Sequence, residues 1–251
     1  MNILKYSAIL ILISATSIIS CKSQPTPYNP NESVIVKRIN TDKISLSEFI
    51  DTTLLQRSEN EIINFKKDDS VNINRKTDIV FVGSSSIRKW TSLKEDLKGL
   101  NAINRGFGGS TVAEAIYYSN TLILKHKPKK IVFYSGDNDV AILNSSSKKI
   151  LKSYKLFYEL IANKLPDTKL FILSIKPSPD RIKFWPQMNE INKMLKNYCT
   201  KTKNCEFIDV STCIFDENKK IKSDVFLKDG IHLNEKGYEI WTSIIYPIIL
   251  N

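Results

Sequence analysis

The sequence predicts an α/β protein, a three-layer α/β/α sandwich built on a parallel sheet with helices on both faces. After residue 77, short apolar runs without polar alternation recur, as in strands that are buried on both faces. Between these runs lie segments whose apolar residues are spaced by three and four positions, as in amphipathic helices. The two kinds of segment alternate to the C-terminus, which is typical of parallel strands joined by crossover helices.

The individual strands and helices can be placed along the chain. The predicted strands cover residues 79–82, 131–134, 170–173 and, less distinctly, 207–210, with a fifth candidate at 102–104. Helices are predicted over residues 146–165, where Pro166 ends the run, and over residues 187–200. The last helical pattern runs from Tyr238 to Ile248, and Pro247 is expected to bend or end that helix.

The length and composition fit one globular domain. A chain of 251 residues with 42% hydrophobic and 25% charged residues can bury a large core, which excludes disordered and collagen-like classes. The net charge is +11, and the basic run Lys125–Lys130 could attract nucleic acid or an anionic membrane. No aromatic residue interleaves that run, so we interpret it as a solvated face and expect no nucleic-acid partner.

The N-terminus has the pattern of an export signal. Lys5 precedes an apolar run over residues 6–19, which fits a signal-peptide core and is short for a membrane-spanning helix. The segment Ile18–Cys21 resembles a bacterial lipobox, which implies a lipoprotein signal peptide over residues 1–20 and a diacylglyceryl group on Cys21. The protein would then be anchored in the bacterial cell envelope. A plain signal peptide followed by an incidental cysteine is the alternative.

Two further segments precede the sandwich domain at residues 78–251. Residues 21–33 are polar and rich in proline, as in a flexible tether. Residues 34–77 are expected to pack on the domain as an extension, with one or two helices between Glu48 and Asp69, because so short a segment would not build its own core.

Three cysteines follow Cys21. Cys199, Cys205 and Cys213 have no clustered histidine, so their spacing does not indicate a zinc site. In an exported protein they could oxidise, and a bridge between Cys199 and Cys205 is the shortest option. Because the number is odd, the sequence leaves open whether any disulfide forms.

The chain contains only two histidines. His126 lies in the basic run without a carboxylate nearby in sequence, and we expect it on the solvated surface. His232 follows Asp229 by three residues, so the carboxylate can fold back onto Nδ1–H, fix the tautomer and stabilise the imidazolium. A surface turn before the last helix would explain the same pattern.

A serine-rich turn, Gly83–Arg88, follows the first predicted strand. Ligands of open parallel sheets bind beyond the carboxyl ends of the strands, and a serine there presents both its hydroxyl and a first-turn N–H group. A helix cap is the alternative. The turn is not the Gly-x-Ser-x-Gly elbow, because Ile87 occupies the second glycine position. Ser86–Lys89 matches Ser-x-x-Lys, but the companion motifs of the β-lactamase class are absent from the sequence.

The next two strands also end in unusual turns. Asn104–Thr111 holds three of the chain's eight glycines, which allow a backbone N–H group to approach a ligand closely. Ser135–Asp139 follows the third apolar run; Asn138 can direct its amide at a ligand there, and Asp139 can cap the following helix. Each turn alone is explained as well by local structure, but their joint placement at successive strand ends indicates one functional site.

In this order the four segments resemble the sequence blocks of the SGNH hydrolases, also called the GDSL esterase/lipase family, over about residues 78–245. The resemblance implies a flavodoxin-like sandwich that carries a serine esterase site. The family's Gly-Asp-Ser is here Gly83-Ser84-Ser85, which leaves Ser84 and Ser86 as alternative nucleophiles. The variant resembles a bacterial subgroup close to the platelet-activating-factor acetylhydrolase-like members, in which a stretch like Glu59–Asp69 also precedes the first strand.

The resemblance also implies a role for each site residue. Ser85 would be the nucleophile, His232 the general base and Asp229 its partner. The backbone N–H groups of Ser85 and Gly109 and the side-chain amide of Asn138 would form the oxyanion hole. No metal or cofactor is implied.

The resemblance leaves the substrate open. Our leading expectation is removal of short acyl groups, acetyl above all, from an acetylated glycan. A lysophospholipase or thioesterase and a non-catalytic glycan-binding module are the alternatives. Arg181 and Trp185 are candidates for the mouth of the site, although a surface cation and a core aromatic residue would explain them equally well.

Overall fold

The computed structural model describes residues 52–250, with side chains from residue 55. The expected signal peptide, Cys21, the tether and the first part of the extension lie outside the described residues. Within residues 52–250, no helix combines the length and the apolar character that crossing a membrane requires.

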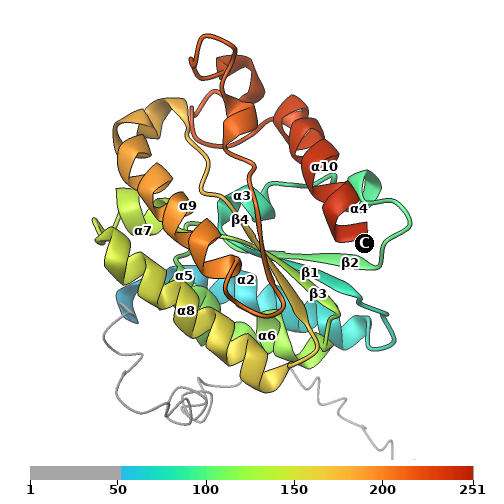
Figure 1. The fold of residues 1–251 in the computed structure, drawn as a ribbon. Helices are drawn as coiled ribbons and strands as arrows, with labels where there is room; N and C mark the ends of the chain where they lie inside the picture. Colours follow the sequence, from blue (N-terminus) through green and yellow to red (C-terminus); the bar gives the residue numbers. More distant parts are fainter. Residues whose placement is uncertain (1–51, 251) are drawn as a thin grey trace, which may run out of the picture. The chain divides into compact units, whose positions relative to one another are not determined.

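The centre of the fold is a sheet of five parallel strands in the order β2-β1-β3-β4-β5 (Figure 1). The strands are β1 Ile79–Gly83, β2 Ala102–Gly106, β3 Lys130–Tyr134, β4 Lys169–Leu173 and β5 Cys205–Ile208. This order is flavodoxin-like and reverses direction at β1, so the carboxyl ends of β1, β2 and β3 meet where such sheets bind ligands.

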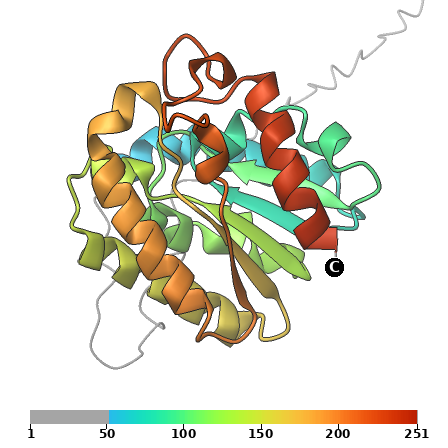
Figure 2. The same ribbon diagram turned by 45° about the horizontal axis from the view of Figure 1, so that its top comes forward.

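Helices cover both faces of the sheet, so the expected three-layer sandwich is confirmed (Figure 2). The helices of four or more residues are α2 Thr52–Val71, α3 Ser85–Arg88, α4 Leu93–Asp96, α5 Val112–Tyr117, α6 Ser119–Leu122, α7 Asp137–Ala141, α8 Ser147–Lys164, α9 Trp185–Cys199, α10 Glu235–Leu250 and the 3-10 helix Pro179–Phe184. Shorter 3-10 turns are Leu124–His126, Thr212–Ile214 and Ser223–Val225.

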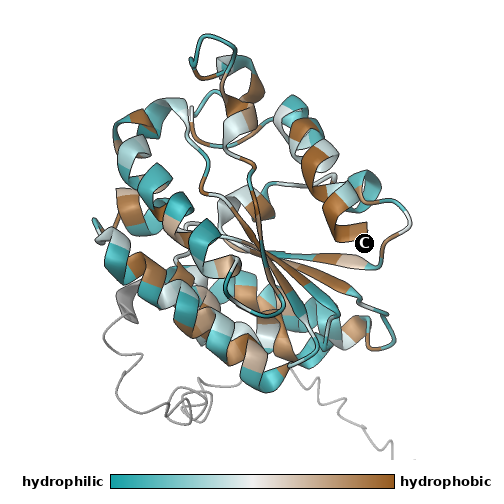
Figure 3. Ribbon diagram, in the orientation of Figure 1, coloured by the Kyte–Doolittle hydropathy of each residue, from teal (hydrophilic) through white to brown (hydrophobic). Residues whose placement is uncertain are grey.

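Strand residues alternate between the two helical layers, although nearly all are apolar (Figure 3). Phe81, Val132 and Phe171 belong to the core shared with α3, α4 and α10, where Trp90 and Trp241 are fully buried. Phe133 faces the other layer and stacks on Phe157 of α8. Burial on both faces explains why these strands lack the polar alternation of a half-exposed sheet.

The bounds of strand β5 and of helices α9 and α10 differ from the expectations, and α9 begins two residues early, at Trp185. Strand β5 is Cys205–Ile208, two residues earlier than the apolar pattern indicated, and Asp209 beyond it accepts N–H groups from the following turn. Helix α10 continues past Pro247 to Leu250. Pro247 lies in the last turn, so the helix continues with one N–H donor fewer.

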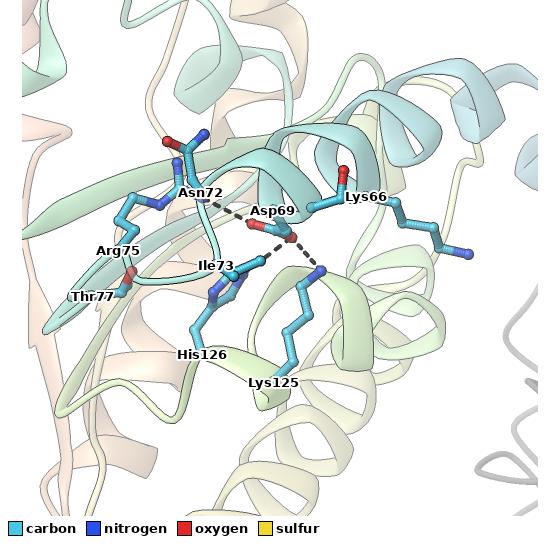
Figure 4. Close-up of a pocket in the computed structure, with 9 residues that line it drawn as sticks. Lys66, Asp69, Asn72, Ile73, Arg75, Thr77, Lys125 and His126 are labelled. Atoms are coloured by element: carbon cyan, nitrogen blue, oxygen red, sulfur yellow. Dashed lines mark hydrogen bonds and ion pairs between the residues drawn. The ribbon is translucent and has the colours of Figure 1, made fainter.

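The end of α2 is joined to the sheet domain by charged residues around a cavity of about 470 Å³ (Figure 4). Asp69 pairs with Arg75, Arg105 and Lys125, and His126 Nε2 lies 3.8 Å from its carboxylate. The expected solvated position of His126 is therefore wrong, because a carboxylate distant in sequence packs against it. Burial lowers the pKa of His126 to about 4, so the ring is neutral at pH 7.

Candidate active site

The structure brings Ser85, His232 and Asp229 together at the carboxyl edge of the sheet. Ser85 Oγ lies 2.7 Å from His232 Nε2, and His232 Nδ1 lies 2.6 Å from Asp229 Oδ2. The other carboxylate oxygen, Oδ1, accepts the backbone N–H groups of Ile231 and His232 at 3.0 Å each. Such a chain of hydroxyl, imidazole and carboxylate can activate a serine as a nucleophile.

The geometry distinguishes Ser85 from its neighbours. Ser84 and Ser86 are fully buried, and no hydrogen bond among the described residues joins either hydroxyl group to His232. Ser85 is the serine that reaches His232. Of the three candidate serines, it alone has the geometry of an activated hydroxyl.

Glycine at position 83 is required for this placement. Gly83 has φ +138°, and a Cβ atom there would lie 1.8 Å from the carbonyl oxygen of Tyr134 in the neighbouring strand. The N–H group of Ser84 donates to that same oxygen at 3.0 Å. The chain thus turns tightly over β3 and starts α3 at Ser85, whose N–H group has no acceptor within the helix.

His232 is held by the turn that leads into α10. The N–H group of Leu227 donates to the carbonyl of His232 at 2.8 Å, and Asn234 Oδ1 accepts the N–H group of Gly237 at 3.1 Å, which caps the first turn of α10. The buried Lys176, just beyond β4, donates from Nζ to the carbonyl of Ile231 at 2.6 Å. The backbone is therefore held by hydrogen bonds before and after His232, which fixes the position of the imidazole.

Asn138 is oriented by two hydrogen bonds. Its Nδ2 donates to the carbonyl of Ser110 at 2.9 Å, and its Oδ1 accepts from Arg181 at 3.0 Å. Arg181 has no acceptor atom, so this bond fixes which end of the amide is the NH₂ group. One N–H of Asn138 is left for a ligand. Arg181 also pairs with the buried Asp137 and is 15% exposed, so it is not the surface cation considered as an alternative.

The other proposed oxyanion donors are backbone groups. No hydrogen bond of the described residues uses the N–H group of Ser85 or of Gly109 as donor. Gly109 has φ +67°, in the left-handed region that favours glycine. A Cβ atom at Gly106 would lie 2.2 Å from the backbone nitrogen of Arg88, so the end of β2 approaches α3 closely. The N–H group at the start of α3 and that of Gly109 in the loop after β2 are thus free to bind an anionic oxygen.

Electrostatics keep His232 available as a base. Burial lowers the pKa of His232 below its ordinary value, and Lys89 and Lys176 lower it further, although Asp229 opposes them. Burial raises the pKa of Asp229, but hydrogen bonds from the His232 backbone and ring outweigh it and leave that pKa well below its usual range. A neutral imidazole beside an ionised carboxylate is the state that a general base requires.

The structure also places Asp139 and Trp185, for which the sequence left alternatives open. Asp139 does not cap its own helix; its carboxylate accepts the N–H group of Val112 at 3.3 Å, at the start of α5, and burial raises its pKa to about 7. Trp185 packs on Phe215 with ring centroids 5.4 Å apart. The sequence reasoning assigned no role to Arg57, Glu61 or Lys176, whose side chains bind backbone carbonyl and N–H groups of the site loops.

The profile described as the GDSL-like Lipase/Acylhydrolase family matches residues 78–240, which include all the candidate site residues. A curated relative, the N-acylneuraminate cytidylyltransferase of Escherichia coli O18:K1:H7, is 24% identical over 210 residues. That alignment covers 78% of this chain and 48% of the relative, so the chain spans about half the length of the curated protein.

Solved structures share the fold at low sequence identity. A Streptococcus pneumonia protein designated a platelet activating factor has a TM-score of 0.70 and 18% identity, covering 81% of this chain and 97% of that one. A GDSL-like lipase from Bacteroides thetaiotaomicron has a TM-score of 0.62 and 21% identity, covering 75% and 98%. A family 3 carbohydrate esterase from Talaromyces cellulolyticus has a TM-score of 0.58 and 18% identity, covering 69% and 96%.

Proposed function

The chain belongs to the GDSL-like lipase/acylhydrolase family, and on that premise we propose that it is a serine esterase whose nucleophile is Ser85. The observation that carries the proposal is the continuous hydrogen-bond chain from Ser85 through His232 to Asp229. Unused donors lie in the loops beside it, at the backbone of Ser85 and Gly109 and at the amide of Asn138.

The reaction proceeds in two displacements. Ser85 Oγ attacks the ester carbonyl while His232 Nε2 takes the hydroxyl proton, and the three donors bind the oxyanion. The intermediate collapses to an acyl-enzyme, and His232 returns the proton to the departing alcohol. Water, activated by the same histidine, then attacks the acyl-enzyme and releases the acid and free Ser85. Asp229 holds the imidazole in the required tautomer throughout.

The substrate we propose is a short acyl ester, acetyl above all, on a carbohydrate. The likeness to a family 3 carbohydrate esterase supports a sugar substrate. The curated relative's name, which refers to an N-acylated sugar, points the same way. A lysophospholipase or thioesterase activity is the alternative within the family.

We also propose that the protein is exported and anchored through a lipid on Cys21, which lies outside the described residues. The sequence of residues 5–21 supports this proposal. Membrane and soluble fractions of cells that express the full chain test it. Wild type should partition with membranes and incorporate labelled fatty acid, and Cys21→Ser should incorporate none; a wild type without the label, or equal incorporation by the two, would count against the anchor.

The first experiment measures hydrolysis of p-nitrophenyl esters, from acetyl to long-chain acyl, by protein that lacks residues 1–21. Ser85→Ala should abolish turnover, whereas the matched variants Ser84→Ala and Ser86→Ala should stay active if folded. The chain-length optimum distinguishes an acetyl esterase from a lipase-like enzyme, and acetate release from acetylated glycans tests the carbohydrate. A folded wild type that is inactive on every ester would favour a non-catalytic glycan-binding module.

A further inference from the structure

Helix α2 lies outside the part of the chain that matches the family, yet it contacts the loop that carries Gly109. Arg57 and Glu61 are four residues apart, so their side chains leave the same face of the helix. Both contact backbone groups of the loop after β2, and neither contacts Ser85, His232 or Asp229.

Glu61 joins that loop to the helix that begins with the nucleophile. Its Oε2 accepts the N–H group of Gly108 at 2.5 Å, and its Oε1 accepts from Arg88 Nη1 at 2.7 Å. Arg88 is the last residue of α3, three positions after Ser85. One carboxylate therefore ties together the two chain segments that supply the Ser85 and Gly109 N–H groups.

Arg57 holds the other side of the same turn. Its Nη2 donates to the carbonyl of Gly109 at 2.7 Å. The guanidinium also lies 3.5 Å from the carboxylate of Glu114, which is 2% exposed and is fixed by a capping box at the start of α5. Arg57 is thus itself anchored on one side and holds the loop on the other.

The peptide bond that carries the Gly109 N–H group lies between these two contacts. Glu61 holds the peptide before it through the N–H group of Gly108, and Arg57 holds the peptide after it through the carbonyl of Gly109. Glycines adopt many backbone conformations, so without these two hydrogen bonds the peptide between Gly108 and Gly109 could rotate and turn its N–H group away. A donor that is fixed before the reaction costs no reorganisation in the transition state.

We propose that Arg57 and Glu61 are positioning residues that fix the Gly109 N–H group for the oxyanion, so that α2 completes the active site. The inference rests on the proposed esterase function. Neither residue touches the substrate's reacting atoms; both act through the backbone of the loop.

The test is steady-state kinetics with p-nitrophenyl acetate on Glu61→Ala, Arg57→Met and the matched control Glu59→Ala, which changes an exposed glutamate of the same helix. Each of the first two variants should lower kcat by on the order of 10- to 100-fold and change KM by less than about threefold. Inhibition by phenylboronic acid, whose serine adduct places an oxygen in the oxyanion hole, should weaken in parallel. Glu59→Ala should behave as wild type.

Glu61→Gln separates positioning from simple stability. Its amide oxygen can still accept the Gly108 N–H group, so it should recover most of the lost kcat, whereas equal loss in the Gln and Ala variants overturns the role of that hydrogen bond. Thermal unfolding is measured for every variant. If Glu61→Ala does not fold, the kcat values of Arg57→Met and Glu61→Gln test the proposal instead.

Three results would overturn the inference. They are an unchanged kcat in folded Arg57→Met and Glu61→Ala, a loss confined to KM, and unchanged boronate inhibition. With an active wild type and an inactive Ser85→Ala, any of these leaves the proposed esterase intact. An inactive wild type removes both proposals.

Discussion

At His232, one carboxylate and two lysines act on an imidazole that is 17% exposed. Asp229 bonds to Nδ1 and favours the protonated ring, whereas burial, Lys89 and Lys176 favour the neutral ring. Lys176 is fully buried, and burial lowers its pKa to about 8, so it is still cationic near pH 6. It also holds the carbonyl of Ile231, next to the histidine.

These charges predict the pH dependence of the rate. His232 must be neutral to accept a proton, and its pKa is lowered from the ordinary 6.5. As pH falls, kcat/KM should therefore decline with a midpoint below 6.5. The pH profile with p-nitrophenyl acetate checks this; a midpoint above about 7, or a flat profile to about pH 4, would contradict the role of His232.

The variant Lys176→Met should change the pH at which kcat/KM falls on the acid side. Removing the cation removes one cause of the lowered pKa of His232, so the acid midpoint of kcat/KM should shift to higher pH. Lys176→Arg keeps a cation and serves as the control. An unchanged midpoint in the Met variant would mean that the lysine acts only through its hydrogen bond to Ile231.

Asn138 is predicted to contribute through the oxyanion alone. Asn138→Ala should lower kcat by on the order of 10²–10³-fold, the usual effect of removing one side-chain donor. Arg181→Met should lower kcat less, because Asn138 keeps its bond to Ser110. Steady-state kinetics of the two variants show which loss of kcat is larger. Full activity in folded Asn138→Ala would remove that residue from the mechanism.

At the scale of elements, the end of α9 and the start of β5 bring two cysteines together. Cys199 and Cys205 are free thiols whose sulfur atoms are 2.9 Å apart. Their mutual hydrogen bond and burial raise the pKa of the Cys205 thiol far above its usual range, so little thiolate is available at neutral pH. The short distance between the two sulfur atoms favours a disulfide bridge. Because the raised pKa of the Cys205 thiol leaves little thiolate, the bridge should form slowly without a catalyst.

We therefore expect a Cys199–Cys205 disulfide under catalysed oxidation and reduced thiols after air exposure at pH 7. The bridge closes a loop of seven residues, and the loop-entropy relation predicts a stabilisation of about 2 kcal/mol. Peptide mass mapping without reductant, and denaturation of both forms, check this. Cys213→Ser serves as the control, and pairing of Cys213 with either cysteine would contradict the geometry.

At the scale of the whole molecule, ion pairs join α2 to the sheet domain. Arg105 of β2 is 4% exposed and pairs with Asp68 and Asp69 at the end of α2. Asp69 also pairs with Arg75 and Lys125 (Figure 4). With Arg105, one carboxylate therefore connects three cations from separate segments. Removing one member of a buried pair is costly because the other charge is left without compensation.

Asp69→Ala should lower the free energy of unfolding by about 3 kcal/mol, since it leaves the buried Arg105 with Asp68 alone. Urea denaturation measures the change. Asp167→Ala, at an exposed aspartate far along the chain, should have little effect. A loss below about 1 kcal/mol for Asp69→Ala would show that the cluster is not what holds α2 on the domain.

The sequence alone determined the fold class and the site, because both depend on local patterns. Runs such as Ile131–Tyr134 predict buried strands, and the turns at Ser85, Gly109 and Asn138 follow three parallel strands that end on one edge. His232 is marked by a different local pattern, the carboxylate of Asp229 three residues before it. Contacts between distant segments were decided by the tertiary structure: the approach of Ser85 to His232, the bond of Arg181 to Asn138, and the position of His126 beside Asp69. No role could be predicted for Arg57 or Glu61 for the same reason, since the backbone groups that their side chains bind carry no sequence signal.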